Sequence, residues 1–163
     1  MGSIETSRGY GLVLLTFVVA LMLSSLHLPP SLDRFRPDWI GLVLIYWSLA
    51  LPNRVGVGTG WVLGLIQDTA QGTLLGQHAL GLATVAWLTV RFHQRIRVFP
   101  LWQQALSVAS FLMIEQLLVV WIKGITGYPP GDWWYLAPPL GGMLAWPWVF
   151  IVLRDLRRRF QVS

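Results

Sequence analysis

Long apolar blocks separated by short polar or charged stretches dominate the pattern of this chain. A membrane-spanning helix needs roughly 20 predominantly apolar residues, so six spans take about 120 of the 163 residues. The remainder suffices for loops and tails but leaves no room for a separate globular domain. The pattern therefore predicts an all-α polytopic membrane protein with a single integral membrane domain over residues 1–163. Its six spans are expected at about residues 10–28, 39–51, 55–70, 77–90, 98–122 and 133–153.

The boundaries of four blocks rest on particular residues. The first block is too long for a signal-peptide core and lacks a good small-residue cleavage site, so we expect an uncleaved span. Asp68 is the single charge in residues 55–90, a length that fits two spans, and Gly72 and Gly76 flank the expected turn between them. The sixth block is expected to bend or to begin late, because each of its prolines removes a backbone donor.

The composition agrees with a membrane protein. Hydrophobic residues make up 55% of the chain, the mean hydropathy is +0.58, and 12 Lys plus Arg with 7 Asp plus Glu are too few charges for a water-soluble surface. The absence of cysteine excludes disulfides, thiolate nucleophiles and sulfur-ligated metals. The basic excess could indicate nucleic-acid binding, but the cations lie mostly between the apolar blocks, where they indicate topology. We therefore expect no nucleic-acid partner.

The positions of the cations also predict the orientation in the membrane. Cytoplasmic loops carry an excess of Lys and Arg. With the N-terminus inside, the six spans leave most cations on the inner side, which favours cytoplasmic positions for both termini. The inner cations are Arg8, Arg54, Arg91, Arg95, Arg97, Arg154, Arg157, Arg158 and Arg159, and the outer ones are Arg34, Arg36 and Lys123.

Two groups of these arginines are expected to anchor the cytoplasmic side. Arg91, Arg95 and Arg97 fall in a predicted basic loop between the fourth and fifth spans, and residues 154–159 close the last span. The terminal group is most simply an inside anchor. It could also attract anionic lipid or an acidic cytoplasmic partner, at about 1 kcal/mol per charge near the surface.

Small residues recur every fourth position in the third span. Gly56, Gly60 and Gly64 follow this spacing, and Asp68 is the next step, so all four lie on one stripe of a helix. A small-residue stripe lets another helix approach closely in lipid, where contact must come from backbone proximity. Two interpretations remain open: packing within this bundle, or docking of a partner's single helix.

Polar residues at similar depth predict a pocket open to the outer side. Asp68 and Glu115 are costly inside a membrane and need partners or a polar cavity. From the helical rise, both lie toward the outer half of their spans, and His78 lies at a similar depth. We expect a polar pocket of these three residues between the third, fourth and fifth spans. Satisfied internal hydrogen bonds, a binding site for a ligand or partner, and a proton relay are the alternatives.

Catalytic and cofactor motifs are sparse. The sequence has no GxSxG elbow and no HExxH motif, and the glycines of residues 56–60 lack the third glycine of a dinucleotide loop. A metal site would have to combine Asp68, His78 and Glu115. We therefore expect no cofactor, no resident metal and no enzymatic activity.

The order of several motifs resembles one known family. The run FRPDWIGLVLIYWSLALPNRVGVGTGWVLG at residues 35–64 is followed by Asp68 and then by three shorter motifs. This series is similar, over nearly the whole chain, to the rod shape-determining MreD family in its gammaproteobacterial form. The shorter motifs are GTLLG at 72–76, LWQQAL at 101–106 and WPWVF at 146–150.

The resemblance implies a fold, a location and partners. The fold is expected to resemble the substrate-binding components of energy-coupling-factor vitamin transporters, in the bacterial inner membrane. The implied partners are the transmembrane helix of MreC and, through MreC, the MreB filament, the glycosyltransferase RodA and a penicillin-binding transpeptidase, with lipids around them. The resemblance assigns the glycine-rich third span and the turn at Gly72 and Gly76 to the family pattern and gives them no chemistry.

Three functional hypotheses follow. The leading one is a non-enzymatic scaffold of the cell-elongation machinery, because so little chain outside the bilayer leaves helices as the main contact with partners. The second is a small-molecule-binding membrane subunit of a vitamin transporter, which the polar pocket and the fold analogy favour, although fold analogy is weak evidence for function. A membrane-embedded hydrolase has the least support, because the sequence offers no assembled nucleophile and base.

Overall fold

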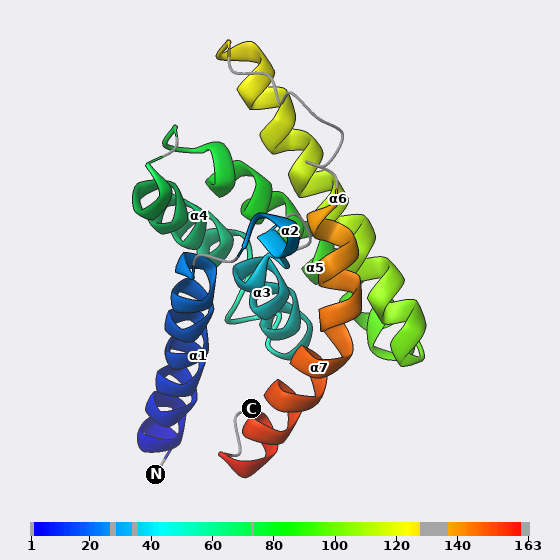
Figure 1. Cartoon of the computed structure of the whole chain (residues 1–163). Coiled ribbons are helices and arrows are strands. Elements are labelled where there is room, and N and C mark those ends of the chain that lie inside the picture. Colours follow the sequence, from blue (N-terminus) through cyan, green and yellow to red (C-terminus); the bar gives the residue numbers. More distant parts are fainter. Residues whose placement is uncertain (1, 27–28, 34–35, 73, 128–136, 161–163) are drawn as a thin grey trace.

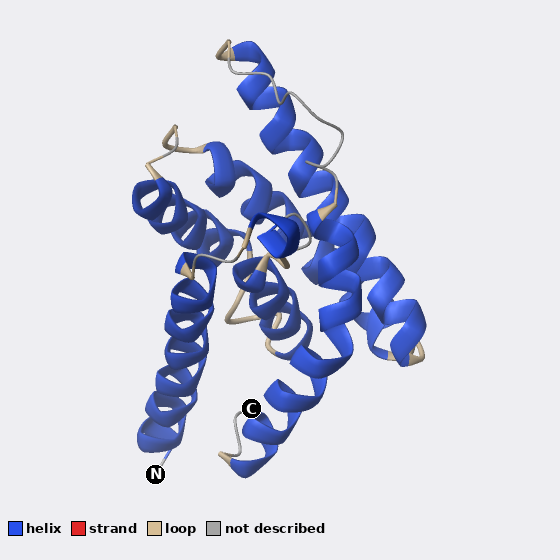
Figure 2. Cartoon of the chain, in the orientation of Figure 1, coloured by secondary structure: helices blue, strands red, loops and turns tan. Residues whose placement is uncertain are grey.

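The computed structural model describes residues 2–26, 29–33, 36–72, 74–127 and 137–160, with side chains from residue 9 onward except at residue 33. Within these ranges the chain is helical and contains no strand (Figure 2). The helices are α1 (Gly2–Ser25), α2 (Pro30–Asp33), α3 (Trp39–Ala50), α4 (Val57–Gln71), α5 (Gln77–Arg97), α6 (Leu101–Ile125) and α7 (Pro138–Arg159).

The six longer helices overlap the six apolar blocks, but some ends differ. The predicted basic loop is wrong, because α5 continues through Arg91, Arg95 and Arg97 and ends at the last of these. Arginine is a good helix former, and cations near a helix C-terminus are favourable. The sixth block begins in part outside the described residues, and α7 starts at Pro138. Proline fits the first helical position, whose N–H has no partner within the helix.

Helix length separates α6 from its neighbours. By length and composition, α6 is the one described helix that could cross a membrane alone, while Gly9–Ser25 and Trp39–Ala50 are shorter apolar helices. The 12 residues of α3 extend for about 18 Å, which is less than the roughly 30 Å of a hydrocarbon core. The number of membrane crossings therefore remains a prediction from the sequence.

The short helix α3 lies at the centre of the bundle (Figure 1). Every residue from Ile40 to Leu49 is buried, as expected for a helix that is apolar on all sides. Helices α1, α5, α6 and α7 pack around it, and α4 packs against α5. Trp47 of α3 and Trp146 of α7 are both fully buried. The Trp47 indole N–H donates to Thr16 Oγ1 of α1 at 2.9 Å, which fixes α1 against the centre.

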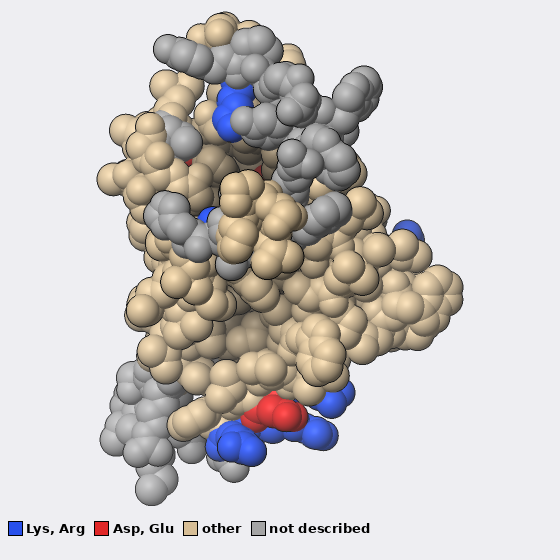
Figure 3. All heavy atoms as spheres, viewed as in Figure 1, with Lys and Arg blue, Asp and Glu red and all other residues tan. Residues whose placement is uncertain are grey.

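The beginning of α1 and the end of α7 lie at the same end of the molecule (Figure 1). Lys and Arg side chains gather at this end in the space-filling view (Figure 3), and α7 carries Arg157, Arg158 and Arg159 in its last turn. The Arg97 guanidinium, at the end of α5, donates from Nε to the carbonyl oxygen of Leu49 at 2.7 Å. It also donates to the carbonyl of Ala50 at 3.1 Å, so it satisfies the C-terminal carbonyls of α3.

Candidate functional site

The buried acid Asp68 organises the turn between α4 and α5. Its carboxylate accepts the backbone N–H of Gly76 at 2.9 Å and that of His78 at 3.0 Å. The His78 ring lies beside the same carboxylate, with Nδ1 2.7 Å from Oδ1. A carboxylate that accepts the first N–H groups of a helix is stabilised by those bonds and by the helix dipole. Asp68 is fully buried and therefore acts as a cap for α5.

The two turn glycines have backbone conformations that other residues rarely adopt. Gly72 follows α4 with a φ of 67°, and Gly76 precedes α5 with a φ of 100°. Glycine takes positive φ at little cost because it has no Cβ. These conformations end α4 at Gln71 and bring the Gly76 N–H to the Asp68 carboxylate.

The glycine stripe of α4 faces α5. A Cβ at Gly60 would lie 2.6 Å from the carbonyl oxygen of Leu82, and one at Gly64 would lie 2.1 Å from Cα of Ala79. The obstructing atoms belong to the α5 backbone, which cannot move aside as a side chain can. Gly56 has open space at the corresponding point. Close approach at Gly60 and Gly64 therefore takes place within the chain, between α4 and α5.

A small polar pocket forms where α1, α4, α5 and α6 meet the segment that precedes α3. Its volume is about 140 Å³, and His78 and Glu115 both line it. Asp68 lies behind His78 and is not part of the lining. The lining residues are Ser24, Arg36, Pro37, Asp38, Gln67, Gln71, His78, Glu115 and Gln116.

The buried acid Glu115 contacts a second carboxyl group in this pocket. Its side chain is within hydrogen-bond range of Asp38, which caps α3 by accepting the backbone N–H of Gly41 at 3.2 Å. A Cβ at Gly81 would lie 2.7 Å from Cγ of Glu115. Gly81 therefore provides the space that the Glu115 side chain occupies against α5.

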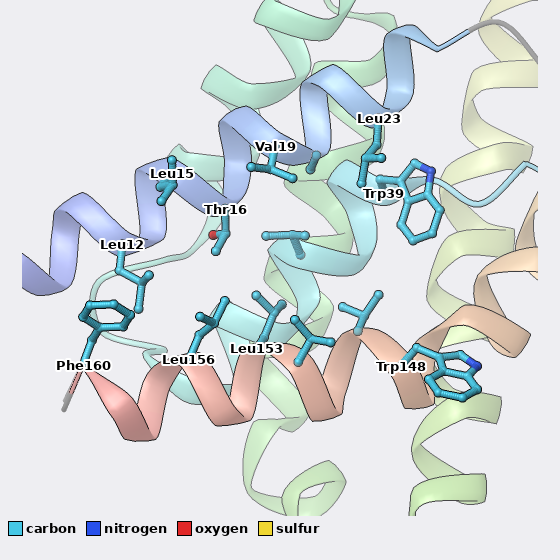
Figure 4. A pocket seen from close by; sticks show the side chains of 14 residues that line it. Leu12, Leu15, Thr16, Val19, Leu23, Trp39, Trp148, Leu153, Leu156 and Phe160 are labelled. Carbon is cyan, nitrogen blue, oxygen red and sulfur yellow. The ribbon is translucent and has the colours of Figure 1, made fainter.

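An apolar groove separates α1 from α7 (Figure 4). Both helices pack against α3, and the space between them measures about 510 Å³. In Figure 4, Leu12 and Thr16 of α1 point toward α7. Thr16 is the polar side chain in the lining, and its hydroxyl already donates to the carbonyl of Val13 and accepts from Trp47. The other lining residues are Ala20, Leu23, Trp39, Val43, Trp148, Val149, Val152, Leu153, Leu156 and Phe160.

Comparison with known proteins identifies the family. The family model described as rod shape-determining protein MreD matches residues 6–156. The chain is also 34% identical over 150 residues to the rod shape-determining protein MreD of Haemophilus influenzae, an alignment that covers 92% of this chain and 93% of that protein. The chain belongs to the MreD family. No solved structure gives a significant match.

Membership in the MreD family gives the chain a role in determining rod shape, in a family of membrane proteins that is not a known enzyme family. The resemblance seen in the order of the sequence motifs is therefore confirmed. The apolar helices α1, α3 and α6 agree with a membrane location.

The MreD-family chain brings together some of the residues singled out in the sequence and separates others. Asp68 and His78 are in direct contact, and Glu115 shares the pocket with His78, but the partner of Glu115 is Asp38. The described residues contain no group of three His, Asp or Glu side chains that could hold a metal ion. The metal set considered from the sequence is therefore not assembled in the described part of the chain.

Sequence reasoning missed Asp38 and Gly81. The signal for Asp38 was its position directly before an apolar block, because an aspartate there is typical of a helix N-cap. An isolated glycine within a helical block, as at Gly81, often has a packing reason. Which helix it packs against could not be read from the pattern.

The arginines at the other end of this MreD-family protein are exposed or half-buried. Arg91, Arg95 and Arg97 project from the last turns of α5. The Arg154 guanidinium lies 5.5 Å from the centre of the Phe150 ring, and that of Arg54 lies 5.3 Å from the Tyr10 ring. These cation–π contacts hold charge beside the aromatic side chains. The arrangement suits an anchor at a charged membrane surface.

Proposed function

We propose that this MreD-family protein is a non-enzymatic inner-membrane scaffold of the bacterial cell-elongation machinery. It binds the transmembrane helix of MreC and thereby couples the MreB filament to peptidoglycan synthesis by RodA and a penicillin-binding transpeptidase. Family membership supports the elongation role. The observation that carries the proposal is the open apolar groove between α1 and α7.

The groove has the length and the apolar lining to receive one face of a partner helix. Its α1 wall runs from Leu12 to Leu23, about 17 Å or three helical turns. The residues on this wall follow helical spacing and form one continuous stripe. Leu15 and Val152, on opposite walls, are 58% and 56% exposed. An apolar partner helix that lies between the walls covers both residues and gains packing contacts that lipid alone provides less well.

The glycine stripe of α4 is not the proposed binding site for the MreC helix. Gly60 and Gly64 already contact the α5 backbone, so a partner helix reaches that surface only if α5 moves away. The groove needs no such rearrangement, because α1 and α7 are held apart by their common contacts with α3.

The proposed placement in the inner membrane has six crossings and both termini in the cytoplasm. The arginines at the end of α7 and the common end of α1 and α7 support this orientation, because basic residues favour the cytoplasmic side. The proposal includes, for the six longer helices, the fold of the substrate-binding components of energy-coupling-factor transporters.

A crosslinking experiment tests the groove. The chain contains no cysteine, so a single Leu15→Cys or Val152→Cys substitution gives one site for a thiol-reactive photo-crosslinker. Each labelled variant is reconstituted with MreC in lipid and illuminated. We expect both positions to crosslink to the MreC transmembrane segment. Leu117→Cys on α6, where the leucine is 50% exposed, is the matched control and is expected to give little product.

Three outcomes contradict the proposed site. Equal crosslinking from residues 15, 152 and 117 indicates random contact in the membrane. Strong crosslinking from residue 117 alone places the partner on α6. Lipid acyl chains that fill the groove instead of a helix leave residues 15 and 152 without MreC adducts. The elongation role is tested separately by depleting the protein from its rod-shaped host, where rounded cells rescued by the wild-type chain are expected.

A further inference from the structure

The polar pocket contains two carboxyl groups and an amide oxygen among its acceptors. Asp38, Glu115 and the amide of Gln67 line a volume of about 140 Å³. Arg36 is the cation in the lining, and its guanidinium Nη2 donates to the carbonyl of Leu23 at 2.9 Å and to that of Ser24. These bonds hold the guanidinium at the C-terminal end of α1. A ligand suited to this lining therefore brings donors rather than acceptors.

The two neighbouring carboxyl groups need a proton or a cation between them. Glu115 is 4% exposed and lies within hydrogen-bond range of Asp38. Two carboxylates at this separation repel one another, so the pair requires either a shared proton or a nearby cation. The described residues assemble no metal-ligand group. An organic cation with N–H donors satisfies both the charge and the hydrogen bonds.

A buried amide oxygen without a partner points to the same place. Gln67 is 6% exposed and lines the pocket, and its Oε1 has no hydrogen-bond partner. A buried acceptor without a partner costs free energy, which an apolar residue of similar size would avoid. Gln67 therefore lowers stability if it only fills space, whereas its Oε1 can accept a hydrogen bond from a ligand that carries donors.

A larger cavity adjoins the pocket and provides space for the rest of a ligand. It measures about 480 Å³, and Ser24, Arg36, Gln67 and Gln71 line both spaces. Leu21, Ile40 and Ala70 give part of its wall an apolar character. A molecule whose cationic group lies between Asp38 and Glu115 can therefore extend past Gln67 into the larger cavity.

From these observations we propose that the polar pocket binds a primary ammonium group, with Glu115, Asp38 and the Gln67 Oε1 as its acceptors. The ammonium belongs either to a free small amine or to the headgroup of an ethanolamine phospholipid. Gly81 makes the site possible, because any side chain there would displace Glu115. This inference is independent of the proposed MreC contact, which lies in the groove between α1 and α7.

The probe for a free amine is 2-aminoethanol, added to the full-length protein in phosphatidylcholine nanodiscs. We expect a saturable rise in Tm, because a ligand that binds only the folded state stabilises it. Ethylene glycol, which has the same size without the charge, is expected to give no shift. Choline keeps the charge but has no N–H donor, and a shift equal to that of 2-aminoethanol contradicts the ammonium assignment.

The probe for a lipid source is a nanodisc that contains phosphatidylethanolamine and no added amine. Stabilisation in either arm that is lost in Glu115→Gln supports the site and identifies the source of the amine. No stabilisation in both arms overturns the proposal. A shift that persists unchanged in Glu115→Gln also overturns it, because the response then arises elsewhere.

Three variants separate binding from folding. Glu115→Gln keeps the shape of the side chain and is expected to weaken 2-aminoethanol binding by about tenfold or more, since it removes a charge-assisted hydrogen bond. Gln67→Leu is expected to weaken binding while Tm without ligand stays equal or rises. A purely structural role for Gln67 predicts the opposite, a lower Tm. Asp155→Asn removes an exposed acid on α7 and serves as the control with unchanged binding.

Discussion

Two pairs of helices in this protein meet in opposite ways. Helices α4 and α5 are in backbone contact, because Gly60 and Gly64 leave no side chain between them. Helices α1 and α7 face one another across an apolar groove with leucine, valine and aromatic side chains on both walls. The first interface is complete within the chain. The second exposes apolar surface that a partner or lipid must cover, so the size of the facing residues distinguishes internal packing from a docking surface.

The largest expected effect comes from forcing α4 and α5 apart. Gly64→Leu places a side chain where its Cβ meets Cα of Ala79 at 2.1 Å. Because backbone must shift, we expect a loss of more than about 3 kcal/mol in the free energy of unfolding. Size-exclusion chromatography and thermal unfolding of the purified protein measure it. Gly58→Leu on the same helix, where the Cβ meets open space, is expected to remain folded. Equal stability of the two variants contradicts the close contact.

Filling the groove between α1 and α7 is expected to affect binding more than folding. Val152→Trp adds volume to the groove wall at a side chain that is 56% exposed. We expect the amount of MreC that co-purifies to fall by at least about tenfold, since a misfit at a packed interface readily costs more than 1.4 kcal/mol. The Tm should change little. Leu117→Trp on α6 is the control, and an equal loss of MreC there argues against the groove as the binding site.

A change in the turn between α4 and α5 is expected to have an intermediate effect on the free energy of unfolding. The Asp68 carboxylate accepts hydrogen bonds from the backbone N–H groups of Gly76 and His78 and lies beside the His78 ring. Asp68→Asn removes its negative charge. We expect the free energy of unfolding to fall by about 1–2 kcal/mol, as for the loss of a helix cap. Thermal unfolding checks this. A variant with wild-type stability that fails to restore rod shape would assign Asp68 a functional role beyond capping.

The smallest effect is expected at the hydrogen bond that joins α1 to α3. Thr16→Val removes the acceptor of the Trp47 indole N–H and leaves that buried donor without a partner. The expected loss is about 1 kcal/mol in the free energy of unfolding. Chemical denaturation in detergent measures it, with Thr84→Val as the control, because the half-buried Thr84 hydroxyl donates to the carbonyl of Leu80 on its own helix. A similar loss in both variants would mean that the threonine side chain, and not the bond to Trp47, is responsible.

Local signals in the sequence predicted the elements better than the contacts between them. The apolar blocks indicated the helices, and the spacing of Gly72 and Gly76 indicated the break after α4, because both depend on neighbouring residues. The depth of His78 and Glu115 along their helices indicated a common pocket. In contrast, the contact of Glu115 with Asp38 joins α6 to a cap 77 positions earlier in the chain, and no local pattern specifies such a pairing.

The two interpretations of the glycine stripe show the same limit. Periodicity placed Gly60 and Gly64 on one face of a helix, but it could not say which helix covers that face. The groove was missed for a related reason. Leu15 and Val152 were visible only as parts of apolar blocks, and their exposure depends on how α1 and α7 diverge around α3.

The burial of α3 also has a mechanical consequence. Since its residues from Ile40 to Leu49 are covered on every side, the thickness of the surrounding bilayer acts on the outer helices and not on α3. Mismatch between a helix and its bilayer costs fractions of a kcal/mol per Å and is relieved by tilt. Tilting α1 or α7 about the fixed α3 changes the width of the groove between them. Membranes of different thickness would therefore be expected to widen or narrow this groove.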